Sequence, residues 1–378
     1  MIKPNKLLYT LAVAAIVVGC EQDYEPVVPD TPTAGYRFTF DGSAGDDNTT
    51  RASWTDNNDG KLTFAWDYTD EDNPRYEMVM GFLTPEGNDF LQTIDGSKYS
   101  DVIIKPHSKD DEHWATFETV KWYDPIMPDS DYDGYTVLAL HGKAIELPDG
   151  SFSNVHMLMP NEFTQREDPT NHLKDFMYMY ADATIQNGSA TLDFRHLTVP
   201  VRFRVYNWRT EASTIYNVIM KEANGGAISR SRIDFTVSES SKSLIPVYPQ
   251  AEFHNYVKVK GVKNNVEGFS INPKGENGDI LTFYAHLLPL GEEDGTLEGK
   301  TLVFTLEVND PSGEGRKTYL TYELPAETFY QATQSYNWQA GDLYTFHLYL
   351  DDVLTVGKVT VNDWDKEEID GGEAEEDI

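Results

Sequence analysis

Short runs in which apolar and polar residues alternate recur along most of this 378-residue chain. Such a period of two is typical of strands with one buried face. No segment shows a helical period sustained for more than about three turns. The sequence therefore predicts an all-β protein built from β-sandwiches. The predicted strands are residues 36–40, 76–83, 116–121, 135–140, 190–194, 201–206, 233–237, 256–259, 280–288, 302–308, 317–322, 344–350 and 356–361.

A hairpin is predicted early in the chain, with Asp59-Gly60 as its turn and residues 61–66 as the strand that leaves it. An Asp-Gly pair between alternating runs is among the strongest local hairpin signals, because both turn residues need a positive φ.

The N-terminus has the layout of a secretory signal peptide. Lys3 and Lys6 precede an apolar stretch of 12 residues, 7–18, and Cys20 follows as the only cysteine of the chain. The stretch is shorter than the roughly 20 apolar residues that a membrane-spanning helix needs. With a cysteine at the cleavage point, this segment resembles the lipobox of bacterial lipoproteins. The resemblance implies that Cys20 is acylated, palmitate included, and holds the protein in the outer membrane at the cell surface.

The net charge limits the partners. Residues 1–19 contain two lysines and no acids, so the formal charge of −33 becomes −35 once they are removed. A chain so acidic repels nucleic acid and anionic lipid headgroups. Attachment to a membrane therefore depends on acyl chains, and with Cys20 acylated no disulfide or thiol chemistry remains.

The chain is divided into five predicted segments: a signal peptide (1–19), a Pro-rich tether (20–35), an N-terminal β-sandwich domain (36–187), a C-terminal β-sandwich domain (188–364) and an acidic tail (365–378). The tail holds eight acids and one lysine, a composition that favours disorder.

Three segments resemble the fimbrillin family of pilus subunits and surface lipoproteins of Bacteroidota. Residues 192–205 contain Phe194-x-His196 followed by Phe203-x-Val205. Residues 340–348 and 359–364 match the family's closing pattern, which ends in Trp364, and Arg51–Trp54 is similar to a start common in these lipoproteins. The resemblance implies two transthyretin-like, Greek-key β-sandwich domains and a structural or adhesive role.

The family resemblance also implies assembly by donor-strand exchange, in which a protease cuts after an arginine and frees the first strand. Here that strand is residues 36–40, with Tyr36, Phe38 and Phe40 alternating, and the cleavage site is Arg51 in the loop that follows. A strand of another pilus subunit then fills the opened sheet by β-strand addition.

A donor strand is predicted at residues 354–361 rather than at the C-terminus itself. Burying the acidic tail in an apolar groove would leave unpaired carboxylates, at several kcal/mol each. Its alternating apolar residues are Leu354, Val356, Val359 and Val361. The alternative is a tip subunit or an anchored surface protein that donates no strand.

A weak calcium signal lies at residues 129–134, where Asp129, Asp131 and Asp133 precede a glycine. Position twelve of such a loop should be a bidentate glutamate, but here it is Leu140. A solvated acidic turn is the preferred interpretation, so no metal or other cofactor is expected. No nucleophile, zinc or nucleotide motif occurs, His196 lies on an alternating strand as a structural residue would, and an enzyme is not predicted.

A glycan-binding outer-membrane lipoprotein is the alternative function, with exposed aromatic side chains as the sugar platform. The candidates cluster at Trp114, Trp122, Tyr123, Tyr132 and Tyr135. Host or bacterial surface ligands are the expected partners of either an adhesin or a glycan binder. A structural surface lipoprotein without a partner is a third possibility.

Overall fold

The computed structural model confirms the all-β class. In the described residues, strands β1 to β26 are accompanied by one α-helix and one 3₁₀ helix. The structure describes residues 39–44, 51–56, 62–65, 78–85, 102–106, 114–119, 133–142, 145–146, 155–187, 190–238, 242–249, 252–273, 280–290, 296–310 and 315–363.

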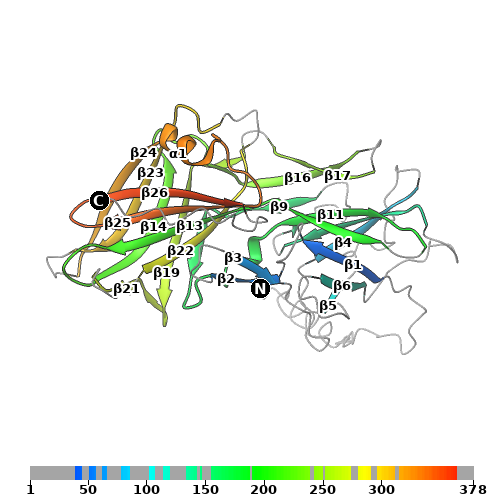
Figure 1. Ribbon diagram of the computed structural model, residues 1–378, viewed down its shortest axis with the longest axis horizontal. Coiled ribbons are helices and arrows are strands. Elements are labelled where there is room, and N and C mark those ends of the chain that lie inside the picture. The colour runs from blue at the N-terminus through cyan, green and yellow to red at the C-terminus, as the bar shows by residue number, and fades with distance from the viewer. Residues whose placement is uncertain are drawn as a thin grey trace, which may run out of the picture. The chain divides into compact units, whose positions relative to one another are not determined.

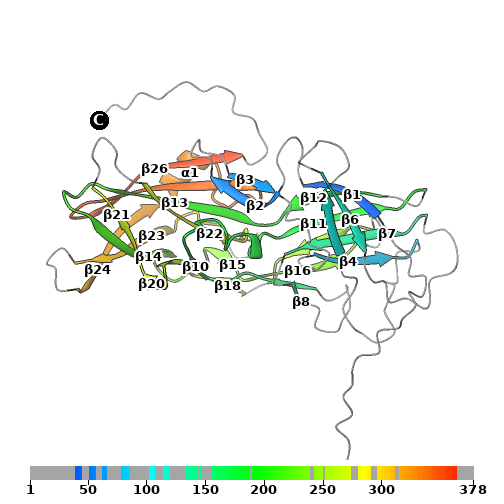
Figure 2. The same cartoon turned by 90° about the horizontal axis from the view of Figure 1, so that it is seen from below.

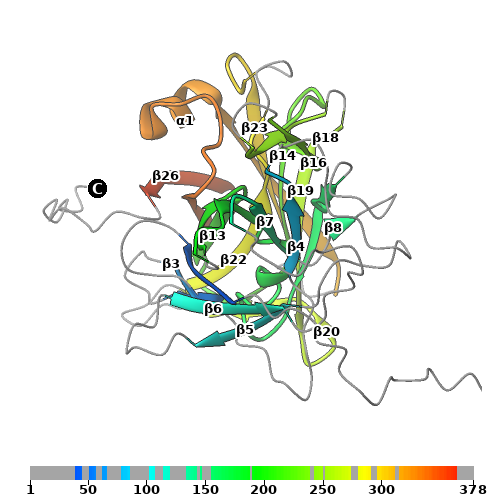
Figure 3. The same ribbon diagram turned by 90° about the vertical axis from the view of Figure 1, so that its right-hand side faces the viewer.

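A seven-stranded sheet is built from strands that lie between residues 39 and 196 (Figure 2). Its fifth strand, β1, lies in the interior, antiparallel to β6 on one side and parallel to β12 on the other. The edge pair β5–β6 is visible in Figure 3. In spatial order the strands are β4 (Met78–Leu83), β7 (Thr136–His141), β11 (Met179–Thr184), β12 (Thr191–His196), β1 (Thr39–Ala44), β6 (Trp114–Thr119) and β5 (Val102–Pro106).

The predicted bounds of the first strand are wrong at the C-terminal side. The strand does not stop at Phe40 but continues through Asp41-Gly42-Ser43-Ala44, which the sequence analysis placed in a loop. These residues have low strand propensity, yet β6 and β12 pair with them from both sides and supply backbone partners. Tyr36 and Phe38 lie outside the described residues. The predicted hairpin is confirmed, since β2 (Arg51–Asp56) and β3 (Leu62–Ala65) pair antiparallel.

A sandwich of two sheets carries most strands of the second half (Figure 1). Phe203 and Phe346 of one sheet meet Phe304 of the other, with ring centroids 4.8 to 6.3 Å apart. This contact marks the middle of the larger hydrophobic core. One sheet is β10 (Glu162–Gln165), β19 (Tyr256–Lys263), β14 (Ser213–Glu222), β23 (Thr301–Asn309) and β24 (Lys317–Pro325), with β20 (Val266–Glu267) and β21 (Phe269–Ile271) at its side; the other is β22 (Ile280–Leu287), β13 (Val199–Asn207), β25 (Asp342–Leu350) and β26 (Leu354–Asp363).

Helix α1 (Ala326–Thr333) contacts β24 and β26, the last strands of the two sheets (Figure 1). Pro325 precedes it in an extended conformation, and Gln334 ends it in the left-handed region with φ of 57°. The buried Phe329 ring packs against Trp338 at 4.8 Å, and the Trp338 indole N–H donates to the Ile228 carbonyl at 2.6 Å. The helix is thereby anchored to the sandwich core.

The two halves of the sequence share sheets. β9 (His156–Leu158) pairs with β16 (Arg232–Val237), and β10 runs parallel to β19. The proposed domain boundary at residues 187/188 falls between β11 and β12, which pair in the same sheet. The division into two domains stays a prediction. The remaining elements are β8 (Ile145–Glu146), η1 (Lys174–Phe176), β15 (Ser229–Arg230), β17 (Leu244–Val247) and β18 (Phe253–His254).

Four histidines, of which His141 and His286 are fully buried and His172 and His196 partly buried, gather where the seven-stranded sheet meets β22. His141 on β7 and His196 on β12 both oppose Met179 of β11, which lies between them. His286 on β22 is close enough to His196 and His172 to feel their charge. Burial lowers the pKa to about 4 for His141 and to about 3 for His196 and His286, and it also lowers the pKa of His172. At neutral pH all four are therefore uncharged.

This cluster predicts acid sensitivity. In the unfolded chain a histidine binds a proton near pH 6.5, whereas in the fold His141, His196 and His286 bind one only near pH 3 to 4. The unfolded state therefore takes up more protons as pH falls below 6.5. The free energy of unfolding should drop by up to about 1.4 kcal/mol per pH unit for each histidine. Chemical denaturation at pH 7.5, 6.5, 5.5 and 4.5 measures this slope.

A His141→Gln variant should show a shallower slope than the wild type, whatever its stability at pH 7.5. A free energy of unfolding that stays constant between pH 6.5 and 4.5 in the wild type contradicts the prediction.

Candidate functional site

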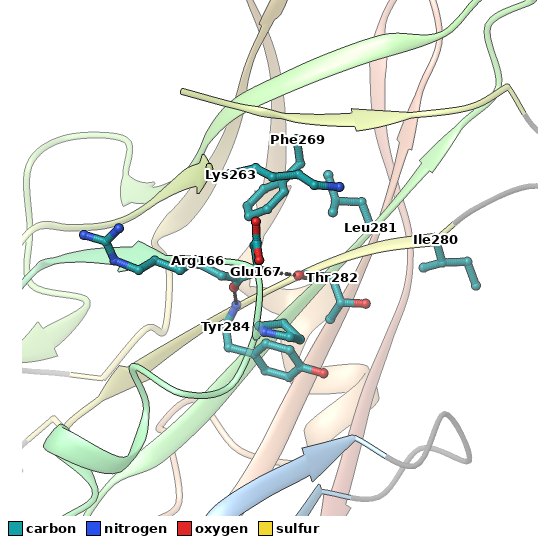
Figure 4. Close-up of a pocket in the computed structure, with 10 residues that line it drawn as sticks. Arg166, Glu167, Lys263, Phe269, Ile280, Leu281, Thr282 and Tyr284 are labelled. Carbon is teal, nitrogen blue, oxygen red and sulfur yellow. Dashed lines mark hydrogen bonds between the residues drawn. The ribbon is translucent and has the colours of Figure 1, made fainter. Parts of the chain in front are cut away.

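Gln165, the last residue of β10, joins the two sheets of the sandwich at one side. Its side chain is only 1% exposed. The amide Nε2 donates to the Thr282 carbonyl at 2.7 Å, and the Tyr284 N–H donates to Oε1 at 3.0 Å (Figure 4). The side-chain amide thus offers β22 the same donor and acceptor that a neighbouring strand would offer.

These bonds show which backbone groups of β22 point away from β13. Alternate residues of a strand direct their N–H and C=O groups to the same edge, so Ile280, Thr282 and Tyr284 share the outer edge. Gln165 covers the Thr282 carbonyl and Tyr284 N–H, and His172 Nε2 bonds the Tyr284 carbonyl at 2.8 Å. Among the described residues, no hydrogen bond reaches the Thr282 N–H or the outer groups of Ile280.

A cleft of about 540 Å³ lies beside this open part of β22. Figure 4 shows Phe269, Lys263 and Leu281 on one side and Thr282 and Tyr284 on the other, with Glu167 between them and Arg166 directed outward. The volume falls in the range of roughly 300–1,000 Å³ that is usual for small-ligand sites. The lining residues are Gln165, Arg166, Glu167, Pro169, Lys263, Phe269, Ile280, Leu281, Thr282 and Tyr284.

Gly261 of β19 explains the position of the aromatic wall. A Cβ at this residue would lie 2.5 Å from Cδ2 of Phe269 and 3.3 Å from Cε1 of Phe283. Only glycine lets the Phe269 ring lie flat on β19. The ring also meets Phe283 edge to face at 5.8 Å, so the apolar side of the cleft is continuous with the core.

Arg204 of β13 stands next to the cleft, since it opposes Thr282 in the β13–β22 register. Its guanidinium Nε is buried without a hydrogen-bond partner. Nearby, the rings of Tyr206 and His347 stack at 5.7 Å, and Tyr206 OH and His347 Nδ1 are 2.9 Å apart. Burial, followed by the charge of Arg204, lowers the pKa of His347 to about 4. The imidazole is therefore neutral at pH 7.

The residues predicted to take part in strand exchange lie in three different strands, β1, β2 and β26. The prediction that Arg51 lies in the loop after the first strand is wrong, because Arg51 is the first residue of β2 and pairs with Ala65 of β3. Phe40 lies in β1 opposite Phe117. Leu354, Val356 and Val359 are buried where β26 packs on the core, and Val361 is partly buried. Cys20 lies outside the described residues.

Of the metal and glycan candidates, only Trp114, Asp133 and Tyr135 lie within the described residues. Asp133 is an exposed turn residue, and Tyr135 is half-buried before β7. Within the described part of the chain, no group of three or more histidine or acidic side chains is arranged to bind a metal. Nor does a helix in that part have the length and apolar character needed to cross a membrane. Trp114 lies in β6, whereas Asp129, Asp131, Trp122, Tyr123 and Tyr132 lie outside the described residues.

Sequence reasoning missed the cleft. Gln165 and Arg166 begin a polar run that reads as a loop, although Gln165 ends a strand. Arg204 is one of two arginines alternating with core residues in β13, and nothing local separates them. Gln165 and Arg204 can be recognised as part of a site only from their contacts with β22, which begins 76 residues after Arg204.

Comparison with known proteins gives structural matches only. Neither the protein-family models nor the curated proteins contain a match. A proposed cell adhesion protein of Bacteroides uniformis is 14% identical, with 88% of this chain and 100% of that chain covered and a TM-score of 0.46. A second one, from Bacteroides ovatus, is 14% identical over 89% and 100% of the two chains, with a TM-score of 0.45. The C-terminally truncated tip fimbrial protein Mfa3 of Porphyromonas gingivalis is 9% identical over 87% and 100%, with a TM-score of 0.34.

Replacing Gln165 tests the connection between β10 and β22. Gln165→Ala leaves the Thr282 carbonyl and the Tyr284 N–H without their partner in a buried position. We expect the free energy of unfolding to fall by about 2–4 kcal/mol, since each unpaired buried group costs about 1–3 kcal/mol. Denaturant unfolding at pH 7.5 measures the change.

The matched control is Thr164→Ala, the exposed neighbour on β10, which should change stability by less than about 0.5 kcal/mol. Equal effects of the two substitutions would show that the amide does not hold the sheets together.

Proposed function

We propose that this protein is a structural or adhesive surface protein of the fimbrillin type, exported as a lipoprotein anchored in the outer membrane through Cys20. In this proposal it assembles with other pilus subunits by β-strand addition after cleavage at Arg51. The lipobox around Cys20 supports the export route. Two of the segments that carry the family resemblance, residues 192–205 and 340–348, support the class, since their strands β13 and β25 are adjacent and parallel, in register from Val201–Tyr344 to Asn207–Leu350.

The observation that carries the proposal is the interior position of β1. The strand connects to the predicted tether at its N-terminal end, and Arg51 begins the next strand, β2. Cleavage after Arg51 would separate β1 and the lipid from the rest of the chain. Loss of β1 leaves β6 and β12 with facing unpaired edges. Two such edges accept one extended strand and satisfy its backbone groups on both sides.

The position of β26 limits the donor role. This strand is paired with β25 along its length, and Leu354, Val356 and Val359 are buried beneath it. A subunit that donates β26 must first release it from its own sheet. A tip or anchor subunit, which accepts a strand without donating one, fits this packing better than a shaft subunit.

Acylation of Cys20 is tested by metabolic labelling in a Gram-negative host. Cells that lack the processing protease and are given radioactive palmitate should label the wild-type protein, and Cys20→Ala should abolish labelling because no other cysteine exists. Arg51→Ala serves as a control that should keep the label. Label on the Cys20→Ala protein contradicts lipid attachment at this residue.

Processing at Arg51 is tested by N-terminal sequencing of protein recovered from the cell surface of a producing strain. The wild type should begin at Ala52, whereas Arg51→Ala should keep a blocked, acylated N-terminus at Cys20. Arg37→Ala, the same change upstream of β1, should be processed like the wild type. A wild-type chain that begins only at Cys20 indicates an anchored protein that does not undergo this exchange.

A further inference from the structure

We propose that the cleft beside β22 binds an acidic saccharide, a short glycan bearing one or a few carboxylates. The proposal names the ligand class for the adhesive role and in that sense rests on the proposed function. Its evidence, however, is the cleft geometry, which depends on neither the lipid nor the cleavage.

Arg166 and Lys263 line the cleft, Arg204 lies beside it, and none of the three has an acidic partner among the described residues. The sequence has 63 acidic residues against 30 lysines and arginines, so a cation in this protein has many possible carboxylate partners. Among the described residues, Arg195, Arg232, Lys258, Lys260 and Lys317 pair with a carboxylate, whereas others such as Lys221 and Lys358 do not. Arg166, Lys263 and Arg204 form no ion pair within the same part of the chain.

The apolar wall suits one face of a sugar ring. Phe269, Leu281 and the 43%-exposed Ile280 place carbon surface along one side of the cleft. Aromatic and aliphatic carbon packs against the C–H groups of a pyranose, while hydroxyls at the ring edge remain free for hydrogen bonds. A saccharide therefore needs both an apolar surface for its ring face and polar partners for its hydroxyls, whereas a free inorganic anion needs no apolar surface.

Polar groups at the open end complete the set. The Thr282 N–H and the Thr282 hydroxyl can donate to ring oxygens or hydroxyls, and Glu167 can accept from two adjacent hydroxyls. Arg166 and Lys263 are exposed side chains at the rim. Arg166 is directed outward in Figure 4 and has to turn inward to bind the ligand carboxylate through two parallel bonds. Glu167 also selects against densely charged polymers, because a second anion near it is repelled.

Other anionic ligands fit these groups less well. Nucleic acid and lipid headgroups meet the repulsion of the whole chain. An acidic peptide could pair with the open edge at Ile280 and Thr282. Its side chains would then have to cover the apolar wall, and its carboxylates would point to both faces of the added strand.

The test measures binding of fluorescent trigalacturonate to the mature chain, residues 20–378, by anisotropy in 0.15 M salt. The matched ligand is the methyl ester of the same trisaccharide, which keeps the rings and hydroxyls and removes the charge. We expect the acid to bind at least tenfold more tightly than the ester. Raising the salt to 1 M should weaken only the acid.

Charge reversal at the rim should abolish this preference. Arg166→Glu/Lys263→Glu is expected to weaken trigalacturonate binding at least tenfold and leave the ester within threefold. Both side chains are exposed, so the fold should persist. The matched control is Lys221→Glu. Lys221 is an exposed lysine on β14, six residues after Ile215, which pairs with Phe269 of the cleft. This control should change affinity by less than twofold.

Three results would overturn the proposal: no saturable binding of the acid by the wild type, equal binding of acid and ester, or equal affinity in the wild type and the double variant. A synthetic peptide of residues 365–378 is the competing ligand. If it binds at the same two cations more tightly than the saccharide, the site is a peptide site. Surface labelling of whole cells tests the proposed function separately, because a protein that binds in solution but is absent from the surface refutes only the adhesive role.

Discussion

Pairing of strand edges is the constraint on which the rest of this structure depends. A sandwich sheet has two outer strands, and each leaves a row of N–H and C=O groups that cost about 1–3 kcal/mol apiece when buried without partners. At β26 the edge lies beside β24 and α1. At β22 the partner is not a strand but Gln165 and His172, which reach the backbone of Thr282 and Tyr284. Because those side chains cover only part of the edge, the cleft remains open at Ile280.

The edge of β22 also determines where Arg204 and Arg166 lie. Arg204 opposes Thr282, and Arg166 follows directly after Gln165, so both positions are fixed by the closure of the sandwich at β22. In a protein with net charge −33, the surrounding surface attracts any mobile cation and repels anions. An anion-binding site therefore has to be local and shaped, with a small group of basic side chains held near an apolar wall.

Local patterns in the sequence identified the strands that alternate cleanly. Residues 201–206, 302–308 and 344–350 lie within β13, β23 and β25, whose inward residues form the Phe203, Phe304 and Phe346 contact. β11 and β14 were missed, although β14 is the middle strand of its sheet. Its Ser213, Asn217 and Glu222 are buried polar groups that hide the pattern.

Features that depend on pairing between distant segments could not be predicted from the sequence. The extension of β1 through Gly42 depends on β12, about 150 residues later in the chain. The histidine cluster joins β7, β12, β22 and the segment before η1, and a lone histidine on a strand gives no sign of this. Gln165 follows the same rule, since a buried amide differs from a loop glutamine only in what it meets across the sandwich.

The burial of β26 bears on how a strand exchange could proceed in this protein. Leu354, Val356 and Val359 are 3%, 7% and 8% exposed, and burying each side chain stabilises the fold by about 1.5–3 kcal/mol. Removing all three from the core thus costs about 5–9 kcal/mol, a large part of the roughly 5–15 kcal/mol that holds a typical domain folded. The interior of the seven-stranded sheet offers a place for an incoming strand once β1 is gone, but that place is in a different sheet. Filling it does not repair the loss of β26, so this chain is better suited to accept a strand than to donate one.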